Sequence, residues 1–448
     1  MKKNLPCFCA GFAVVLSAAA ALTCARPKSG AWERWGITRP APDAAEPRLA
    51  AACNLLYATK YDSACQAYSD LVRDHPGSAE AHLGLSIADR CLGRRESAYV
   101  EAKRALALEP EGTGVLCNYA DLLQPARGAY LADAMNDSAR FEASIAAAGK
   151  AARTGHRYAA YSHFTSWVDY LWAGRLADAR REIKTLAANS YFPPALLEFA
   201  RNLLTAIEPN AVLLTDCGDC LGPLFSVQDL EGLRPDVTIV NLALLNSPRA
   251  TAMMRDSLRL PVSFSDPELN GLRAARDSAA GRATYACDRL VSDIIAHARK
   301  QNRPVYFATI TSAEAMGDWK DYTVKEGLVR RVIAVKAADS SDLPRMIENT
   351  ERRYRLTAAG QPTDWRANMS PLTRGIPWLV LNYAAIYMDI ANYYRGRSDM
   401  AKVDEACRQA YELVEQTNDA QWTSKVVSVW LNLNPSSVEA RKLSSESD

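Results

Sequence analysis

Apolar side chains recur every three or four residues from about residue 48 to residue 205, the spacing that places them on one face of a helix. Two segments of this stretch repeat after 34 residues and end at Pro76 and Pro110. A repeat of that length indicates one helix pair per copy, because a single pair cannot bury its apolar face without a neighbouring copy. The pattern therefore predicts a stack of helix pairs.

Small side chains in these copies stand where the two helices of a pair must approach closely. In the copy that ends at Pro110, Gly93 occupies the turn, and Ala98 and Ala105 occupy packing positions on the second helix. The preceding copy has Thr59 in place of the turn glycine, and its equivalent packing residues are Ala52, Ala64 and Tyr68. The pattern resembles the tetratricopeptide repeat (TPR), in which each unit is a helix–turn–helix.

Further copies follow along the chain. The register breaks near residue 123 and resumes near residue 161, where Gly174 precedes Ala179 by the interval that separates the turn glycine from the packing alanine in the earlier copy. Near the C-terminus, Gly396 precedes Ala401 by the same interval. We therefore expect TPR-like helices on both sides of a different central segment.

The central segment consists of short apolar runs separated by helical patterns. Strands are predicted at Ala211–Thr215, Val237–Leu245, Arg303–Thr309 and Val329–Val335, and helices at Pro223–Leu233 and Ala286–Lys300. A strand, helix and strand in that order form a right-handed βαβ unit with parallel strands. Continuous apolar strands indicate a sheet covered on both faces. The predicted fold class is thus α/β plus all-α, with TPR-like helical repeats flanking a small parallel-sheet, Rossmann-like α/β module.

These patterns divide the chain into five stretches. Residues 1–24 are predicted to be a signal peptide, 25–47 a linker, 48–205 TPR-like helical repeats, 206–340 the α/β module, and 341–448 a C-terminal helical region with a further TPR-like repeat. The linker is inferred from its content of proline, alanine and charge.

The first residues indicate an export signal. Lys2 and Lys3 form a positive start, and Ala10–Leu22 form an apolar stretch too short for a stable membrane anchor. Cys24 follows at the place of a lipid-modified cysteine, although Ala21 stands where lipoprotein signals usually have leucine. Lipidation at Cys24 and plain secretion both remain open, with an uncleaved anchor as a third alternative. We expect a protein of the periplasm, or a lipoprotein of the outer membrane.

Composition and charge argue against three classes of protein. The chain has 53 basic and 51 acidic residues, a net charge of +2, and no basic run, so nucleic acid is not an expected partner. Charged residues make up 23% and hydrophobic residues 48%, which excludes wholesale disorder and a multi-span membrane protein.

Eleven cysteines would suit disulfides in an oxidising compartment, but the placement of several of them weakens that expectation. Five fall inside helical patterns, where cysteine often serves as a small buried hydrophobe: Cys53, Cys65, Cys91, Cys117 and Cys407. Cys217 and Cys220 have C-x-x-C spacing, for which reduced structural thiols, a disulfide, and a redox or metal role remain open. A zinc site would need a second ligand pair, which the sequence lacks, so no metal is expected.

Ligands of an open parallel sheet bind beyond the carboxyl ends of its strands. Asp216, Gly218 and Asp219 follow the first predicted strand, Asn241 lies in the second, and Gln228 lies on the helix between them. Carboxylates there can accept hydrogen bonds from the hydroxyl groups of a ligand, and glycine lets the backbone approach a ligand. These five residues are the candidate ligand-binding set. Turn formation and helix capping by the two aspartates, and internal hydrogen bonding by Asn241 and Gln228, are the alternatives.

Signals for catalysis and for cofactors are missing. The sequence has no G-x-S-x-G nucleophile turn, no G-x-G-x-x-G and no P-loop lysine, so neither a nucleotide nor another cofactor is expected. His297 falls in a helical pattern with no evident acid or nucleophile partner. The other histidines belong to the repeats: His75, His82, His156 and His163. We therefore expect no catalytic residue and no self-sufficient enzyme.

The segment 211–245, AVLLTDCGDCLGPLFSVQDLEGLRPDVTIVNLALL, resembles the extracytoplasmic C-terminal region of bacterial multi-span proteins related to protein O-mannosyltransferases, a region shared by standalone TPR lipoproteins. RPVYFATI and the segment KDYTVKEGLVRRV resemble it too, so the likeness covers roughly residues 206–415. The relatives' loop is N-G-D-x-D-T; here Gly218 and Asp219 match, but Leu221 and Gly222 replace the second Asp and the Thr. The resemblance implies an accessory or binding domain, because the relatives' sugar transfer is associated with a membrane-embedded part.

Together these observations predict a non-catalytic exported TPR scaffold that binds a protein or peptide partner in the cell envelope, possible partners including a membrane glycosyltransferase. The alternative is a protein that binds a sugar or another small molecule in the crevice of the α/β module, or that serves a glycosyltransferase as an accessory.

Overall fold

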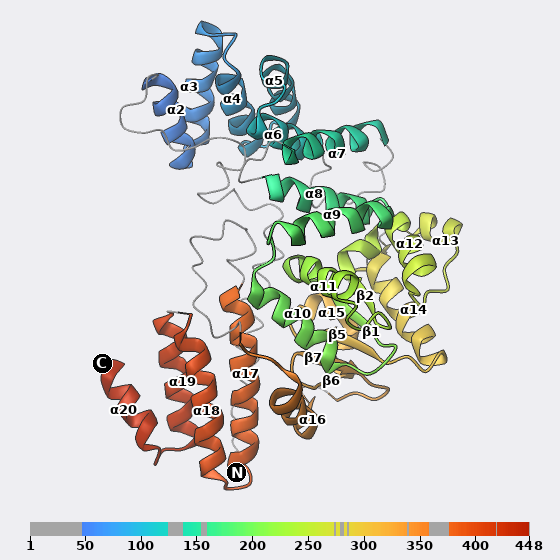
Figure 1. The fold of residues 1–448 in the computed structure, drawn as a ribbon, viewed down its shortest axis with the longest axis vertical. Helices are drawn as coiled ribbons and strands as arrows, with labels where there is room; N and C mark the ends of the chain where they lie inside the picture. The colour runs from blue at the N-terminus through green and yellow to red at the C-terminus, as the bar shows by residue number, and fades with distance from the viewer. Residues whose placement is uncertain are drawn as a thin grey trace. The chain divides into compact units, whose positions relative to one another are not determined.

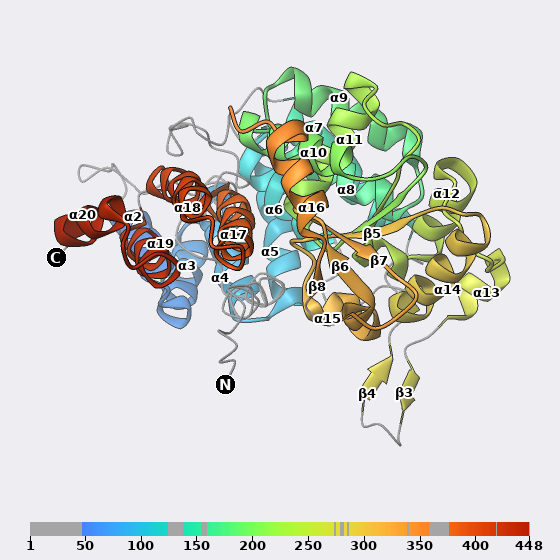
Figure 2. The same cartoon turned by 90° about the horizontal axis from the view of Figure 1, so that it is seen from below.

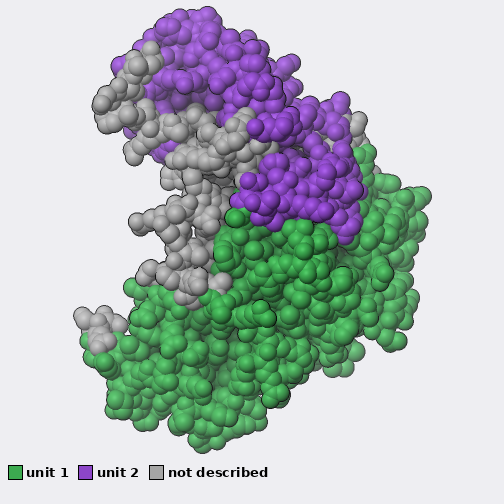
Figure 3. Space-filling view, viewed as in Figure 1, with its two compact units in different colours: residues 1–19, 190–448 green, residues 20–189 purple. Residues whose placement is uncertain are grey.

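The computed structural model describes residues 47–123, 138–153, 159–272, 275–277, 282–284, 286–337, 340–357, 376–417 and 419–447. In this part of the chain two compact units divide between residues 189 and 190 (Figure 3). The first unit along the chain ends at residue 189 and is labelled unit 2 in Figure 3, and the second unit starts at residue 190 and is labelled unit 1 there. The predicted signal peptide, with Cys24, and all but the last residue of the predicted linker lie outside the described residues. Across the described ranges, the model contains no helix with the length and apolar character needed to cross a membrane.

The first unit is a series of helix pairs (Figure 1). Each helix packs against the next one along the chain, as expected for a repeat array whose copies contact their neighbours. The helices are α2 (Pro47–Tyr57), α3 (Tyr61–Asp74), α4 (Ala79–Cys91), α5 (Arg95–Leu108), α6 (Thr113–Leu123), α7 (Ser138–Ala152), α8 (Ala159–Trp172) and α9 (Leu176–Ala188). The predicted TPR-like helix pairs are confirmed.

The turns between α2 and α3, between α4 and α5, and between α8 and α9 share one backbone conformation. Gly93 and Gly174 have φ angles of 78° and 72°, in the left-handed region that glycine enters without steric cost. Thr59, which replaces the glycine in the first pair, has a φ of 59°. Ala98 and Ala179, five residues after the two glycines, are fully buried where the helices meet. The small residues identified in the sequence therefore have the packing role predicted for them.

A histidine–glutamate pair recurs in two copies of the repeat. His82 Nδ1 on α4 lies 2.6 Å from Glu101 Oε2 on α5, and His163 Nδ1 on α8 lies 2.5 Å from Glu182 Oε2 on α9. The second histidine and the second glutamate both follow their counterparts by 81 residues, as Gly174 follows Gly93. The two helix pairs thus have the same register in their side chains as well as in their turns.

The second unit is built on a six-stranded sheet with the strand order β2-β1-β5-β7-β6-β8. The strands are β1 (Val212–Thr215), β2 (Thr238–Asn241), β5 (Val305–Ala308), β6 (Thr323–Lys325), β7 (Val329–Val332) and β8 (Ser340–Ser341). β1 pairs in parallel with β2 and β5, whereas β7 runs antiparallel to both β5 and β6. The sheet is therefore mixed, and the prediction of a purely parallel sheet was wrong.

The reason for the antiparallel strand is the length of one connection. Only Glu326, Gly327 and Leu328 join β6 to β7, and a parallel connection would need a crossover of a dozen or more residues. Gly327 has a φ of 103°, so the tight turn uses a conformation that favours glycine. The strand predicted at Val237–Leu245 is also shorter than expected, because the chain enters a 3₁₀ helix after Asn241.

Helices and short helical turns surround the sheet. In chain order they are α10 (Pro194–Ala206), α11 (Gly218–Glu231), η4 (Leu242–Asn246), α12 (Pro248–Leu258), α13 (Asp266–Gly271), α14 (Ala286–Lys300), α15 (Ala313–Met316), η5 (Gly317–Tyr322), α16 (Leu343–Glu348) and the π-helical turn η6 (Asn349–Arg353). A separate hairpin of β3 (Ala275–Asp277) and β4 (Arg282–Thr284) extends away from the six-stranded sheet in Figure 2.

The last four helices belong to the same unit as the sheet. They are α17 (Ile376–Arg395), α18 (Met400–Glu415), α19 (Ala420–Leu433) and α20 (Val438–Ser447). α17 packs against α10 and α16, and its Asp389 forms a 2.6 Å ion pair with Lys325 of β6, whose side chain is 3% exposed. The Asn202 amide of α10 donates to the Tyr383 hydroxyl at 2.7 Å. Buried polar contacts therefore hold this helix against the α/β module.

The turn between α17 and α18 corrects one detail of the repeat assignment. Its left-handed residue is Ser398, with a φ of 60°, and α18 starts two residues later, as α5 does after Gly93. Gly396, the predicted turn glycine, does not have a positive φ. Consequently Val403, which is fully buried, takes the place predicted for Ala401.

Candidate functional site

The carboxyl ends of β1, β2 and β5 lie at one edge of the sheet, because these three strands are parallel. The chain leaves β1 toward β2 and later crosses back to β5 on the other side of β1. The connections therefore diverge between β1 and β5, the type of point at which open α/β sheets form a ligand crevice. The candidate site is built from the residues that follow these three strand ends.

Asp216, directly after β1, bridges this point. Its carboxylate accepts a hydrogen bond from the Ser312 backbone N–H at 3.0 Å and another from the Ser312 hydroxyl at 2.7 Å. Ser312 Oγ also accepts from the Ala315 N–H and so caps α15. Asp216 thus fastens the loop after β1 to the segment after β5, which agrees with the interpretation that it stabilises a turn.

Asn241 ties the end of β2 to the same loop. Its side-chain oxygen accepts from the Ala243 N–H at 2.9 Å and caps η4, and its amide donates to the Cys217 carbonyl at 3.4 Å. The side chain is almost completely buried. The three strand ends are therefore joined by Asp216 and Asn241, whose polar groups are used within the protein.

The start of α11 is the open part of the site. Gly218 is exposed, and a Cβ atom at this position would meet nothing within 4 Å, so no steric demand requires a glycine here. Asp219 lies in the first turn of α11, and its side chain is outside the described residues. Unpaired backbone N–H groups of a helix start favour anionic or acceptor groups.

Gln228 lies at the opposite end of the strands from the other candidates. Its amide donates to the carbonyls of Arg234 and Val237, which precede β2, at 2.8 and 2.9 Å. Arg234 in turn donates to carbonyls at the end of α10 and pairs with Asp236, whose pKa it holds at about 2. Gln228 therefore has the internal hydrogen-bonding role, and the structure does not bring it together with Asp216, Gly218 and Asn241.

Ser312 is the residue of this site that sequence analysis did not single out. The serine starts the motif Ser312-Ala313-Glu314-Ala315, and its position just before a helix was a recognisable capping signal. Its pairing with Asp216 was not recognisable, because the two residues are 96 positions apart and meet only through the order of the strands.

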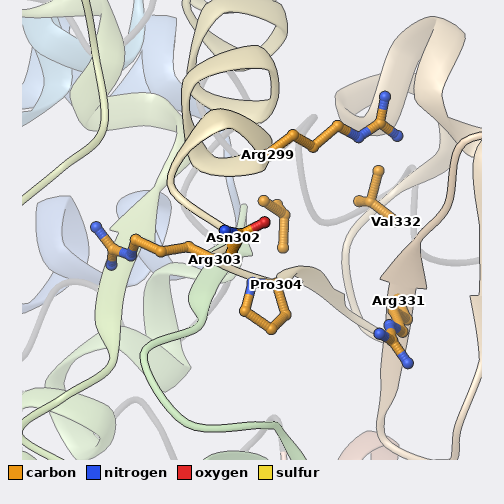
Figure 4. A pocket seen from close by; sticks show the side chains of 7 residues that line it. Arg299, Asn302, Arg303, Pro304, Arg331 and Val332 are labelled. Atoms are coloured by element: carbon orange, nitrogen blue, oxygen red, sulfur yellow. The ribbon is translucent and has the colours of Figure 1, made fainter.

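A cavity lies at the opposite edge of the sheet, beside the amino end of β5 (Figure 4). Its volume is about 270 Å³, and it is lined by Arg299, Asn302, Arg303, Pro304, Val305, Arg331 and Val332. The three arginines are engaged within the protein. Arg299 donates to the Ile333 carbonyl at 2.7 Å, Arg303 donates to the Arg259 carbonyl at 2.6 Å, and Arg331 lies 3.2 Å from Glu208. The arginines that line the cavity therefore have structural roles within the protein.

The chemistry available at the strand ends is hydrogen bonding. Asp216, Asn241 and Ser312 offer acceptors and donors, and the α11 start offers backbone N–H groups. In the parts of the chain that the structure describes, no three His, Cys, Asp or Glu side chains form a group that could hold a metal ion.

A family model, TMEM260-associated domain 2, matches residues 196–270, the segment from α10 through most of α13. Among solved structures, the chain is similar to one in the APC/C hetero-tetramer Cut9–Hcn1, with 10% identity and a TM-score of 0.26 over 91% of this chain and 49% of that chain. It is also similar to a chain in the structure of Naa15/Naa10 bound to HypK-THB, with 15% identity and a TM-score of 0.22 over 90% of this chain and 65% of that chain.

The chain thus spans about half the length of the first of these solved chains and 65% of the second. A comparison with curated proteins finds no match. The assignment of helical repeats rests on the helix pairs, turns and buried alanines described above.

Proposed function

We propose that the protein is a non-catalytic scaffold whose helical repeats bind a protein or peptide partner. The observation that carries this proposal is the run of helix pairs α2 to α9, in which each helix packs against its neighbour in sequence. Arrays of this kind present a continuous surface made by one face of successive helices, and that surface suits an extended partner.

Helix α5 indicates where such a partner would bind. Val100 and Leu108 are 47% and 44% exposed, which is unusual for large apolar side chains in this unit. They lie on one side of the helix at an interval of eight residues, with Arg104 between them. Arg104 is largely exposed and donates to Glu101 at 2.7 Å. Two apolar side chains around a cation suit a segment that has apolar residues beside an acidic one.

Photo-crosslinking in the source cells tests this proposal. A benzoylphenylalanine residue at Val100 or Leu108 should form a covalent adduct with one protein of defined mass. Val438, in the other unit, is the matched control, because it is a valine with 82% exposure and should give no such adduct. Adducts from Val438 alone, or from none of the three positions, would contradict binding at α5.

We propose further that the scaffold works in the cell envelope, attached through a lipid on Cys24. The support is the sequence pattern: two lysines, the apolar stretch Ala10–Leu22, and a cysteine two residues after it. Membrane fractionation of cells fed with radioactive palmitate tests this idea. Wild-type protein should carry the label, Cys24→Ser should lose it, and an unlabelled wild-type protein would refute lipidation.

A membrane glycosyltransferase is the partner that the sequence resemblance suggests. The segment 211–245, which resembles a region of proteins related to protein O-mannosyltransferases, lies inside the residues matched by TMEM260-associated domain 2. Affinity purification in mild detergent should recover a multi-span protein at constant stoichiometry. Recovery of soluble proteins only would argue for a scaffold without this partner.

A small-molecule site at the start of α11 is the second candidate function. The open space at Gly218 favours it, since a ligand oxygen could approach the helix start there. A thermal-shift screen with monosaccharides should then show a rise in Tm that Asp219→Ala removes. Asp216→Ala is the control for stability, because it should lower Tm in the absence of sugar by breaking both bonds to Ser312.

A further inference from the structure

Cys217 is the N-cap of α11 and Cys220 lies in its first turn, at the helix that follows β1 (Figure 1). Their sulfur atoms are 2.7 Å apart, and both are thiols in the structure. Cys217 is half-buried, whereas Cys220 is 2% exposed. Cys217 is therefore accessible to a molecule in solution, and the buried Cys220 has its sulfur close enough to form a disulfide with it.

Cys217 lies in the electropositive surroundings of a helix start. Cys217 caps the helix, and its sulfur accepts a hydrogen bond from the Cys220 backbone N–H at 3.2 Å. α11 is 14 residues long, so its N-terminus carries the positive end of a full helix dipole. A backbone N–H donor and the positive end of a helix dipole are the surroundings typical of cysteines that attack disulfides.

Other cysteines of the protein have the opposite surroundings. Burial, together with the adjacent Asp288 carboxylate, raises the pKa of Cys287 to about 11. Burial and Asp89 raise the pKa of Cys65, and burial raises that of Cys91 to about 12. In these three cysteines the thiolate is therefore disfavoured.

We propose that Cys217 and Cys220 form a redox-active dithiol that exchanges electrons with accessible disulfides. The Cys217 thiolate attacks one sulfur of a disulfide RSSR, forms a mixed disulfide, and releases RS⁻. Cys220 then loses its proton to water, and its thiolate attacks the Cys217 sulfur and releases the second RS⁻. The cysteine pair is oxidised by two electrons to a disulfide, and RSSR is reduced to two thiols.

The surrounding structure suits both steps. Gly218, between the two cysteines, is exposed, and Cys217 is itself partly exposed, so this turn faces solvent where a disulfide would approach. The Asn241 amide donates to the Cys217 carbonyl, and Asp216, the residue before Cys217, accepts a hydrogen bond from Ser312. The turn is therefore held in place while the two sulfurs change partners. C-x-x-C at a helix start within a βαβ unit is the arrangement of known dithiol sites.

Exchange of the full chain with oxidised glutathione tests the proposal. The reduced protein is incubated with mixtures of reduced and oxidised glutathione, quenched with acid, alkylated and mapped by peptide mass spectrometry. The wild type should form a Cys217–Cys220 disulfide. Cys220→Ser should instead keep glutathione on Cys217, because the resolving thiol is gone, and Cys217→Ser should form neither product.

A rate measurement on the wild type needs no variant and remains informative if a serine variant fails to fold. Cys217 should react with iodoacetamide at pH 7.5 at least about tenfold faster than Cys287, which lies in the first turn of another helix in the same unit. Equal rates, or glutathione that stays on Cys217 of the wild type, would overturn the proposal. The outcome does not depend on whether the helical repeats bind a partner.

Discussion

Gly84 offers a test of how closely the helices of the first unit pack. It lies inside α4, where replacing glycine with alanine usually stabilises a helix by about 1 kcal/mol. Here a Cβ atom would lie 2.1 Å from Cε1 and 2.3 Å from Cζ of the Tyr68 ring on α3. Tyr68 is 1% exposed, so its ring cannot move aside into solvent. We therefore expect Gly84→Ala to destabilise the unit.

The magnitude follows from two opposing effects. Overpacking a well-filled core costs about 1 to 3 kcal/mol, and the gain in helix propensity offsets about 1 kcal/mol of it. A Cβ atom 2.1 Å from the ring places the cost in the upper part of that range, about 2 to 3 kcal/mol, so the expected net loss is about 1 to 2 kcal/mol, which lowers Tm by roughly 2 to 8 °C for a unit of this size. Gly149 is the matched control, because it also lies in a helix but the nearest atom to its Cβ would be Arg153 Nη1 at 3.7 Å.

Urea unfolding followed by circular dichroism should show opposite signs for the two variants, with Gly84→Ala less stable and Gly149→Ala up to about 1 kcal/mol more stable than the wild type. The double variant Gly84→Ala/Tyr68→Leu should lose less than the two single changes add up to, because the smaller side chain makes room for the methyl group. A Gly84→Ala variant as stable as Gly149→Ala would refute the close contact between α3 and α4.

Three further predictions concern backbone strain, a buried ion pair and pH. Thr59→Gly should stabilise the first unit by about 0.5 to 1 kcal/mol and Gly93→Ala should destabilise it by about 1 to 2 kcal/mol, because both positions have a positive φ. Urea midpoints of the two variants equal to that of the wild type would contradict this. Lys325→Ala should cost about 3 kcal/mol by leaving Asp389 unpaired, and Lys325→Met/Asp389→Leu should recover most of the loss. Burial raises the pKa of Glu326 from 4.5 to about 7, so between these values the folded protein holds a proton that the unfolded chain releases. Tm should therefore fall as the pH rises from about 5 to about 8, and it should fall less steeply in Glu326→Gln.

The helical repeats were predictable in detail because their signals are local. Turn glycines, buried alanines and the 34-residue interval all lie within one copy, so the sequence identifies Gly93, Ala98 and Ala105 without reference to the rest of the fold. The turn residue of the C-terminal copy was predicted wrongly, because the left-handed residue there is Ser398, two positions after the glycine that matched the pattern.

The sheet and the candidate site were less predictable, because they depend on contacts between distant segments. The order of the strands decides that Asp216 meets Ser312, and no local pattern contains that information. Gln228 was grouped with the crevice by its closeness in sequence, but α11 carries it to the other end of the strands. Helix length, which separates the two ends of α11, was the signal that could have excluded it.

Partner recovery with a charge variant tests the central claim most directly. The full chain is purified from its source cells beside Val100→Asp/Leu108→Asp, which changes only exposed positions on α5 and should leave Tm within about 1 °C of the wild type. The account predicts a stoichiometric partner on the wild type and on Cys217→Ser, and its loss from the double aspartate variant. A partner that stays bound to the folded double variant would contradict a scaffold that binds through its helical repeats.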